Sequence, residues 1–355
     1  MPKHIKFPSI EQFRHTISQV NKMFQFAGLD EQGNPIYDHS KTSPVIKFKG
    51  SVKLHGTNAA VCFNHVDGLY VQSRENVITP EKDNAGFAKF VMDRKDDFLA
   101  MFDKIIGKEK HKADFIDGTI VLFGEWAGGN IQPQDIGIAK LEKSFYIFGL
   151  FVSPNEDTRS EFDKLHNRIL AKDWLDYSYL RNGAARIFNI QDYASYEMDI
   201  DFNMPQLVQN SLSALTIAVE EECPVTSAFG YKGVGEGIVW TGECNGYRLQ
   251  FKVKGEKHSS SKVTTLAAVD VEKLNSMIEF IDNVCTESRF NQAIEKVFEG
   301  GEPTIQKTGD VIKWFVGDVM KEEIDTMKSN NIDQKEVGSH ISKRVKEMFI
   351  KHLNS

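Results

Sequence analysis

The sequence predicts an α+β protein, with mainly antiparallel sheets and flanking helices followed by a small all-helical domain. Between Val45 and about residue 255, short segments alternate apolar and polar residues with the period of two that is typical of strands. After about Ser260, apolar residues recur three or four positions apart, which is typical of helices. We therefore expect two domains, at residues 1–262 and 263–355.

The first elements follow from local spacing and turn chemistry. Residues 9–26 have helical spacing, and a polar, turn-rich loop is expected at 29–44. In "VIKFKGSVKLHG" the alternation predicts a strand that begins at Val45. Gly-Thr-Asn at 56–58 has turn chemistry, so "AAVCFN" is expected to return as a second strand and "LYVQSR" as a third.

The middle of the chain adds one helix and further strands. Residues 87–106 have the spacing of a single helix, and 157–220 mixes helical segments with loops. Buried or central strands are expected at "TIVLFGEWAGG", "SFYIFGLFV", "GEGIVW" and "YRLQFKVKG".

The C-terminal part has three stretches of helical spacing. They consist of Val271, Leu274, Ile278 and Ile281; of Ile312, Phe315 and Val319, with Glu322 and Glu323 beside Ile324; and of Val337, Ile341, Val345 and Met348. Asp333 and Glu336 resemble a capping box at the start of the last one.

Composition narrows the class of protein. The chain is 41% hydrophobic and 26% charged, an ordinary globular balance, and its net charge of −7 argues against a generic nucleic-acid binder. Four scattered cysteines without a C-x-x-C pair argue against a zinc site and against a disulfide framework. With no signal peptide and no apolar run of membrane-spanning length, we expect a soluble, intracellular, cytoplasmic protein. Walker A, dinucleotide, H-E-x-x-H and G-x-S-x-G patterns are also absent.

Two lysine clusters could carry chemistry. Strand parity places Lys53 on one face with Ser51 and His55, opposite Val52 and Leu54. Lys252 and Lys254 likewise share a face, opposite Leu249, Phe251 and Val253. Each cluster could be a solvated strand face. If the three lysines meet, they could bind a phosphate, and like-charge repulsion would favour the neutral, nucleophilic amine.

Two acids and one aromatic residue complete the candidates. Glu125 ends a strand and Glu236 opens another, each beside glycine, where a carboxylate can bind a ribose hydroxyl or a divalent metal. Taken singly, each acid is better interpreted as a loop residue. Phe148 is interpreted by default as a residue of the hydrophobic core.

Taken together, these segments resemble the covalent nucleotidyltransferases. Six motifs carry the resemblance in this order: K-x-H-G-T-N from Lys53, S-R, F-G-E, F-Y-x-F, E-G-x-V and K-x-K. His55 and the following Thr-Asn are similar to the RNA ligase 2 branch of ATP-dependent RNA ligases, since DNA ligases usually have aspartate at the position of His55. The resemblance covers residues 45–260 and implies a nucleotidyltransferase (ligase adenylylation) fold for the first domain.

The resemblance implies a role for each matching residue. On the phosphate side, Lys53 would be adenylylated, Lys252 and Lys254 would contact the α-phosphate, and Glu236 would contact the metal and the lysine. The remaining matches would bind the nucleotide or the RNA end. Glu125 would bind ribose, Phe148 would stack on adenine, Val52, Leu54 and Asn58 would line the nucleotide pocket, His55 would support RNA-end chemistry, and Arg74 would lie near ribose and RNA.

Three positions depart from the family pattern. Val52 stands where the branch often has glutamate, so a side-chain contact to adenine is lost there. Gly149 replaces a common aspartate, and Trp240 stands where lysine is frequent, which affects the expected RNA-end contacts.

The implied activity is ATP-dependent joining of RNA 3′-hydroxyl and 5′-phosphate ends, through a lysyl-AMP intermediate and an adenylylated RNA 5′ end, in RNA repair. ATP would donate AMP, with Mg²⁺ or Mn²⁺, and the partners would be ATP and RNA as a nicked duplex or free ends. We expect no membrane association and no obligatory protein partner, and a phage-encoded enzyme acting in a bacterial host also fits.

Alternatives are a DNA ligase, a capping-type nucleotidyltransferase, and a non-catalytic RNA-binding relative. The basic residues Lys343, Arg344, Lys346 and Lys351 could contact RNA phosphates, or could form a solvated helix face.

Overall fold

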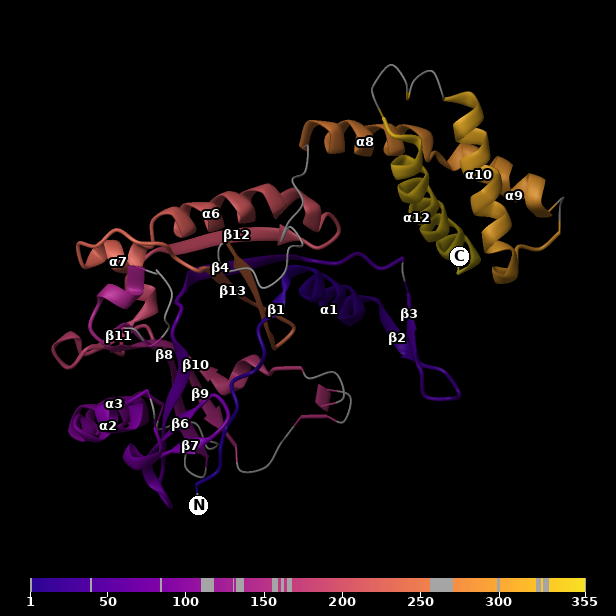
Figure 1. Ribbon diagram of the computed structural model, residues 1–355. Coiled ribbons are helices and arrows are strands. Elements are labelled where there is room, and N and C mark those ends of the chain that lie inside the picture. Colours follow the sequence, from indigo (N-terminus) through magenta and orange to yellow (C-terminus); the bar gives the residue numbers. More distant parts are fainter. Residues whose placement is uncertain are drawn as a thin grey trace. The chain divides into compact units, whose positions relative to one another are not determined.

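The computed structural model describes residues 2–38, 40–83, 85–109, 118–129, 131, 137–154, 159–160, 163–164, 168–255, 271–298, 301–323, 327 and 332–354. The chain forms two compact units. The first takes in residues 1–18, 45–201 and 210–267, and the second takes in 19–44, 202–209 and 268–355. Two sheets with flanking helices, together with a group of C-terminal helices, confirm the α+β class (Figure 1). The expected boundary at residue 262 lies outside the described residues, so the division there stays a prediction.

A five-stranded sheet of the first unit carries both lysine clusters. Its order is β1 (Glu11–Gln12), β14 (Tyr247–Lys254), β13 (Gly237–Cys244), β4 (Val45–Lys53) and β12 (Ser195–Asp201). All neighbours are antiparallel except β1 and β14. Ile46, Phe48 and Val52 are buried while Lys47 and Lys49 are exposed, so the strand parity read from the sequence is confirmed.

A seven-stranded sheet forms the other half of the first unit. Its strands are β5 (Thr57–Asn64), β6 (Gly68–Ser73), β7 (Val77–Ile78), β8 (Thr119–Ala127), β9 (Ser144–Ser153), β10 (Trp174–Leu175) and β11 (Ile187–Asn189). Their order is β10-β9-β8-β5-β6-β7, and β11 pairs with β9. Both faces are buried, because Ala59 and Val61 belong to one core cluster while Ala60 and Cys62 belong to another.

The helix expected at 87–106 is two helices, α2 (Phe87–Met92) and α3 (Lys95–Glu109). At the junction, the Arg94 side chain donates hydrogen bonds to the carbonyls of Phe90 and Ala185, at 3.3 and 2.9 Å. This side chain satisfies the carbonyl of Phe90 near the end of α2, where no further helical turn follows. The apolar spacing continues across the break, which explains why the sequence reads as one helix.

The connection from β4 to β5 also differs from expectation. The Gly-Thr-Asn segment suggested a hairpin, but β4 pairs with β12 and β13 whereas β5 pairs with β6 and β8. The chain therefore crosses from one sheet to the other at Leu54–Gly56. A Cβ atom at Gly56 would overlap the Trp126 carbonyl oxygen, so glycine lets this crossing pack closely against β8.

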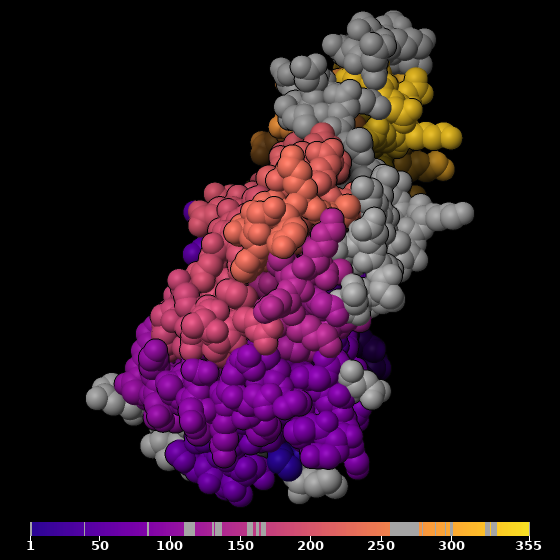
Figure 2. Space-filling view, turned by 60° about the vertical axis from the view of Figure 1, so that its left-hand side comes forward, coloured from indigo at the N-terminus to yellow at the C-terminus, as the bar shows by residue number. Residues whose placement is uncertain are grey.

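Further helices complete the first unit. They are α6 (Gln209–Glu221) and α7 (Pro224–Ala228), whose outer surfaces are coloured salmon to orange in Figure 2. Helix α1 (Phe13–Gln25) confirms the opening helix, and its Phe13 ring lies 4.8 Å from the ring of Phe251 in β14. Short 3₁₀ turns occur at 80–82, 137–140, 171–173, 183–185, 190–192, 205–208 and 305–307.

The second unit begins with a hairpin where a loop was expected. Strands β2 (Phe26–Leu29) and β3 (Pro35–Tyr37) pair with each other. The Asp30 carboxylate accepts hydrogen bonds from the backbone N–H groups of Gln32 and Asn34, at 2.9 and 2.7 Å, which fixes the turn. Because the strands are only four and three residues long, their alternation was not visible in the sequence.

Four helices make the core of the second unit. They are α8 (Val271–Val284), α9 (Glu287–Phe298), α10 (Thr308–Glu322) and α12 (Gln334–Leu353), and α9 was not predicted. Phe315, Val319 and Val345 are fully buried, as their spacing indicated, whereas Ile324 lies outside the described residues. The Asp333 carboxylate caps α12 by accepting from the N–H groups of Lys335 and Glu336, at 3.0 and 2.9 Å. Within the described ranges, every helix is too short or too polar to cross a lipid bilayer.

Candidate active site

The three lysines meet on one face of the five-stranded sheet. In the antiparallel register, Gly237 of β13 faces Lys53 of β4 on one side and Lys254 of β14 on the other. Val239 stands between Ser51 and Lys252 in the next row. A Cβ atom at Gly237 would overlap the Val253 carbonyl oxygen, and its φ of +146° also favours glycine. The glycine thus leaves no side chain between Lys53 and Lys254.

Glu236, the residue before β13, connects these side chains. Its Oε2 atom lies 2.6 Å from Lys53 Nζ and 3.5 Å from His55 Nδ1, and its Oε1 atom lies 2.7 Å from Lys254 Nζ. The Glu236 side chain is only 2% exposed, whereas those of Lys53 and Lys254 are 21% and 28% exposed. The Gly255 N–H donates to the Glu236 carbonyl at 3.1 Å, which also fixes the backbone. The carboxylate therefore aligns two ammonium groups at the edge of a cavity.

Charge and burial act in opposite directions at this carboxylate. Burial alone would raise the pKa of Glu236, but attraction to Lys53 and hydrogen bonds from Lys254 and Lys53 outweigh it and hold this pKa below its usual value. Burial, followed by repulsion from Lys254 and Lys53, lowers the pKa of Lys252. The cluster thus holds an ionised acid among closely spaced cations.

Glu125 reaches the same cavity from the seven-stranded sheet. It pairs in register with Asn58 of β5 and Tyr146 of β9, and its Oε1 atom accepts the Gly56 N–H at 3.0 Å. Burial raises the pKa of Glu125 to about 7, against the attraction of Lys53. The β4–β5 crossing therefore connects the Lys53 strand directly to this acid.

Phe148 lies at an irregularity of β9. The β8–β9 register shifts between Phe123 and Gly124, so Phe148 has no partner residue in β8. The ring of Phe7 meets the ring of Phe148 edge-on at 5.1 Å and also contacts Phe123 at 5.0 Å. These contacts fix the orientation of the Phe148 ring in the cavity wall.

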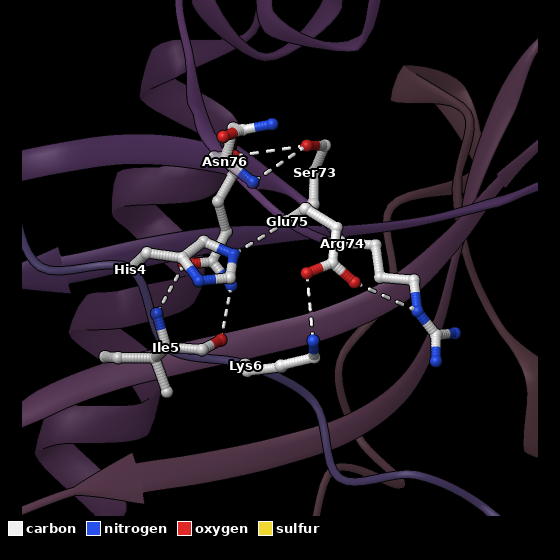
Figure 3. A network of polar contacts seen from close by, with 8 residues as sticks. His4, Ile5, Lys6, Ser73, Arg74, Glu75 and Asn76 are labelled. Carbon is white, nitrogen blue, oxygen red and sulfur yellow. Dashed lines mark hydrogen bonds and ion pairs between the residues drawn. The ribbon is translucent and has the colours of Figure 1, made fainter.

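Arg74 follows β6 at the rim of the cavity. Figure 3 shows the Glu75 carboxylate between Arg74 and the N-terminal residue Lys6, at 3.5 Å from Arg74 Nε and 2.9 Å from Lys6 Nζ. The Ile5 N–H donates to the side-chain oxygen of the buried Gln72 at 3.0 Å. The N-terminal segment therefore holds the strand end that carries Arg74.

One cavity of about 420 Å³ brings all the predicted site residues together. These are Val52, Lys53, Leu54, His55, Asn58, Arg74, Glu125, Phe148, Glu236, Lys252 and Lys254. Their individual roles stay predictions. Sequence reasoning missed other lining residues outside the motifs, namely Phe7, Pro8, Ser9, Ile10, Tyr177, Ile190, Thr241 and Gln250, and it gave no role to Tyr146, which lies inside the F-Y-x-F motif. Strand parity could have revealed Gln250, because it shares a face with Lys252.

The donor groups bear on the expected divalent metal. Among the described residues, no group of three or more His, Cys, Asp or Glu side chains could hold an ion alone. Glu236 is the carboxylate closest to the lysines, and both of its oxygens contact them. Such a site suits a magnesium-like ion that is bound largely by substrate phosphates with one carboxylate.

Comparison with known proteins identifies the family. The RNA ligase family profile matches residues 47–254, which is more than half of the chain and includes every predicted site residue. The chain belongs to the RNA ligase family. No curated protein matches it.

Solved structures of a Naegleria gruberi RNA ligase are also similar to the chain. The complex with pyrophosphate has 15% sequence identity and a TM-score of 0.40, and a point mutant with ATP and Mn has 13% identity and a TM-score of 0.42. Each alignment covers 73% of this chain and 58% of the Naegleria chain. This chain thus spans less than two thirds of the relatives' length.

Proposed function

We propose that this protein is an ATP-dependent RNA ligase that joins 3′-hydroxyl and 5′-phosphate ends through an AMP adduct on Lys53. Membership in the RNA ligase family supports the reaction class. The observation that carries the proposal is the Glu236 carboxylate, which holds Lys53 and Lys254 at 2.6 and 2.7 Å on one cavity wall. His55 and the following Thr57-Asn58 support the RNA ligase 2 branch and a role in RNA repair.

The cavity suits one nucleotide. Its volume of about 420 Å³ lies in the range of small-molecule sites. Lys252 and Lys254 would bind the α-phosphate, Glu125 would accept hydrogen bonds from ribose hydroxyls, and the Phe148 ring would stack on the base. Val52 and Leu54 would line the pocket around the nucleotide, as would Asn58, while His55 and Arg74 would meet the RNA end.

The first step forms the adduct. Lys53 must leave its ion pair with Glu236 and give a proton to solvent before its nitrogen can attack, and the nitrogen gives up a second proton to solvent as the adduct forms. Incoming phosphate oxygens would compete with Glu236 for Lys254. They would also contact Lys252. The nitrogen–phosphorus bond to the α-phosphorus then forms as the bond to the bridging oxygen breaks, and pyrophosphate leaves with that electron pair.

Two transfers would complete ligation. An oxygen of the RNA 5′-phosphate attacks the adduct, the nitrogen–phosphorus bond breaks, and Lys53 is regenerated. The 3′-hydroxyl then attacks the activated 5′-phosphate, AMP leaves, and a phosphodiester forms. A divalent ion, Mg²⁺ or Mn²⁺, would neutralise phosphate charge when bound, with Glu236 as its nearest protein carboxylate. The cations of Lys252 and Lys254 would stabilise charge on the non-bridging oxygens.

A sealing assay tests this function and separates it from the alternatives. The protein is mixed with 5′-phosphorylated nicked RNA, nicked DNA or single-stranded RNA, with ATP or GTP and magnesium. We expect sealing of RNA with ATP. Sealing of DNA alone would indicate a DNA ligase, use of GTP without sealing would indicate a capping-type enzyme, and no AMP adduct would indicate a non-catalytic RNA-binding relative.

A further inference from the structure

A buried polar atom in the cavity has no role in the reaction described above. Gln250 of β14 lies on the same strand face as Lys252, and it pairs in register with Thr241 of β13. Its Nε2 atom donates to Thr241 Oγ1 at 2.9 Å. Among the described residues, its Oε1 atom is buried and has no hydrogen-bond partner. Both side chains line the nucleotide cavity.

Such an atom is costly in a folded protein. An unpaired buried acceptor destabilises the folded state by about 1–3 kcal/mol, so most such atoms are paired. Here the amide is also held in one orientation by its bond to Thr241. A ligand that brings a hydrogen-bond donor to this position would recover the lost interaction.

The position of Gln250 relative to the lysines indicates which part of a nucleotide it meets. Along the sheet face, the Thr241–Gln250 row lies beyond the Val239–Lys252 row, on the side away from Lys53 and Lys254. The phosphate would lie at the lysines, so the Gln250 row is at the opposite end of the ligand.

A series of side-chain contacts runs from Phe148 to the strand that carries Gln250. Phe148 contacts Phe7 at 5.1 Å, Phe7 contacts Trp174 at 5.6 Å, and the guanidinium of Arg248 lies 4.3 Å from the Trp174 ring centroid. Arg248 is two residues before Gln250 on β14, and so lies on the same strand face. These contacts end on β14 two residues from Gln250, and Phe148 and Gln250 both line the cavity.

We propose that Gln250 recognises the base, with its Oε1 atom accepting a hydrogen bond from the 6-amino group of adenine and Thr241 holding the amide in place. This inference rests on the proposed function and adds its base specificity. The side chain of Val52, the residue before the proposed nucleophile, has no polar group to offer a base. Guanine has a 6-keto oxygen instead, which would face the Gln250 oxygen without a proton between them.

A nucleotide analogue tests the contact directly. Purine riboside triphosphate is ATP without the 6-amino group. In self-adenylylation, we expect the wild-type KM for ATP to be about tenfold lower than for the analogue, equivalent to about 1.4 kcal/mol. In Gln250→Leu the two KM values should become equal, mainly because KM for ATP rises. A purely structural role would change both nucleotides by the same factor and would overturn the proposal.

Further variants keep the test decisive. Thr241→Val frees the amide, and we expect discrimination to fall to about threefold. Asn64→Leu removes an amide at the end of β5 that also donates to a threonine hydroxyl, Thr119 Oγ1 at 3.2 Å, but does not line the cavity, so the ATP-to-analogue ratio should stay at the wild-type value. If Gln250→Leu does not fold, Gln250→Met replaces it in the same KM comparison.

Two outcomes separate this proposal from the one on which it rests. Equal or better use of inosine triphosphate by the wild type would show that the amide presents its amino group to a 6-keto purine, and would overturn the assignment to adenine. Absence of any adduct with wild-type protein would instead contradict the proposed function.

Discussion

At the scale of single residues, Glu236 determines the geometry of the candidate site. Its nearly buried carboxylate lies within 2.7 Å of two ammonium groups that come from strands far apart in the sequence. Removing its charge would leave closely spaced cations without a counter-ion, and would remove the group that aligns Lys53, the proposed nucleophile.

We predict that Glu236→Gln lowers the rate of self-adenylylation by at least about 100-fold, which is typical for loss of a preorganised charged group. Stability should fall by about 1–3 kcal/mol, since both lysines remain in contact with water. AMP transfer from labelled ATP and urea unfolding measure the two effects. Glu197→Gln is the control. Glu197 of β12 forms an ion pair with Lys47 of β4, the strand that carries Lys53, and this pair is 3.8 Å long and mostly exposed. Full activity in Glu236→Gln would contradict the assigned role.

Glu125 gives a prediction about pH. Burial raises its pKa in the folded protein from 4.5 to about 7, so the folded state favours the neutral acid. The resulting stabilisation is fully present below pH 4.5 and is lost as pH rises through 7. The wild-type free energy of unfolding should therefore decline relative to that of Glu125→Gln between about pH 4.5 and 7, by about 3 kcal/mol at most. Urea unfolding of both proteins at several pH values measures this, and a constant difference would refute the raised pKa.

At the scale of elements, strand β13 sets the spacing of Lys53 and Lys254. Gly237 lies between Lys53 and Lys254, and the Val253 carbonyl leaves no space for a Cβ atom. A larger residue must push β14 away from β13, which would move Lys254 away from Glu236.

Gly237→Ala should therefore abolish most self-adenylylation and destabilise the fold by about 2 kcal/mol or more. Gly246→Ala is the matched control, because Gly246 also has a positive φ, of +75°, but its Cβ atom would meet no atom within 4 Å. Adenylylation rates and melting temperatures of the two variants should differ clearly. Equal behaviour would show that backbone strain alone, and not the close approach to Val253, limits this position.

The elements also show how far the sequence could predict the site. The faces of β4 and β14 followed from their alternation, because successive residues of a strand point to opposite sides. Which strands are neighbours depends on pairing across nearly 200 residues, so the position of β13 between Lys53 and Lys254 could not be read locally. The crossing at Gly56 was hidden for the same reason, since its turn residues suit a hairpin equally well.

The N-terminal segment shows a second limit. Phe7 and Ile10 line the cavity, but their neighbours show neither a motif nor a clear period, so nothing local indicated a role. Their position depends on long-range contacts, such as the bonds between Ile5 and Gln72. The order of six motifs predicted the part of the cavity around Lys53, Lys252 and Lys254. The residues of the remaining cavity walls could be identified only from the three-dimensional fold.

At the scale of the whole molecule, a net charge of −7 means that the proposed RNA substrate would have to bind a local basic surface. Helix α12 carries the exposed residues Lys343, Arg344, Lys346 and Lys351. We propose that these residues contact RNA phosphates. Removing the C-terminal helices would be a less specific test, because Leu207 packs in the same core cluster as those helices.

Replacing these four residues with alanine should weaken RNA binding and sealing but leave self-adenylylation unchanged. The slope of log affinity against log salt should become shallower by up to about 3, at about 0.7–0.9 for each lost phosphate contact. Replacing the exposed Lys89, Lys95, Lys104 and Lys108 of α2 and α3 removes the same charge elsewhere and serves as the control. Equal loss of affinity in both variants would indicate a general charge effect and not a site on α12.

The adduct itself is the most direct test of the account. Wild-type protein is incubated with magnesium and ATP labelled at the α-phosphate, denatured, separated on a gel and digested for peptide mapping. We predict label that survives denaturation, maps to Lys53 and is absent from Lys53→Ala. Label retained by Lys53→Ala, or mapped to another residue, would contradict the assignment of the nucleophile.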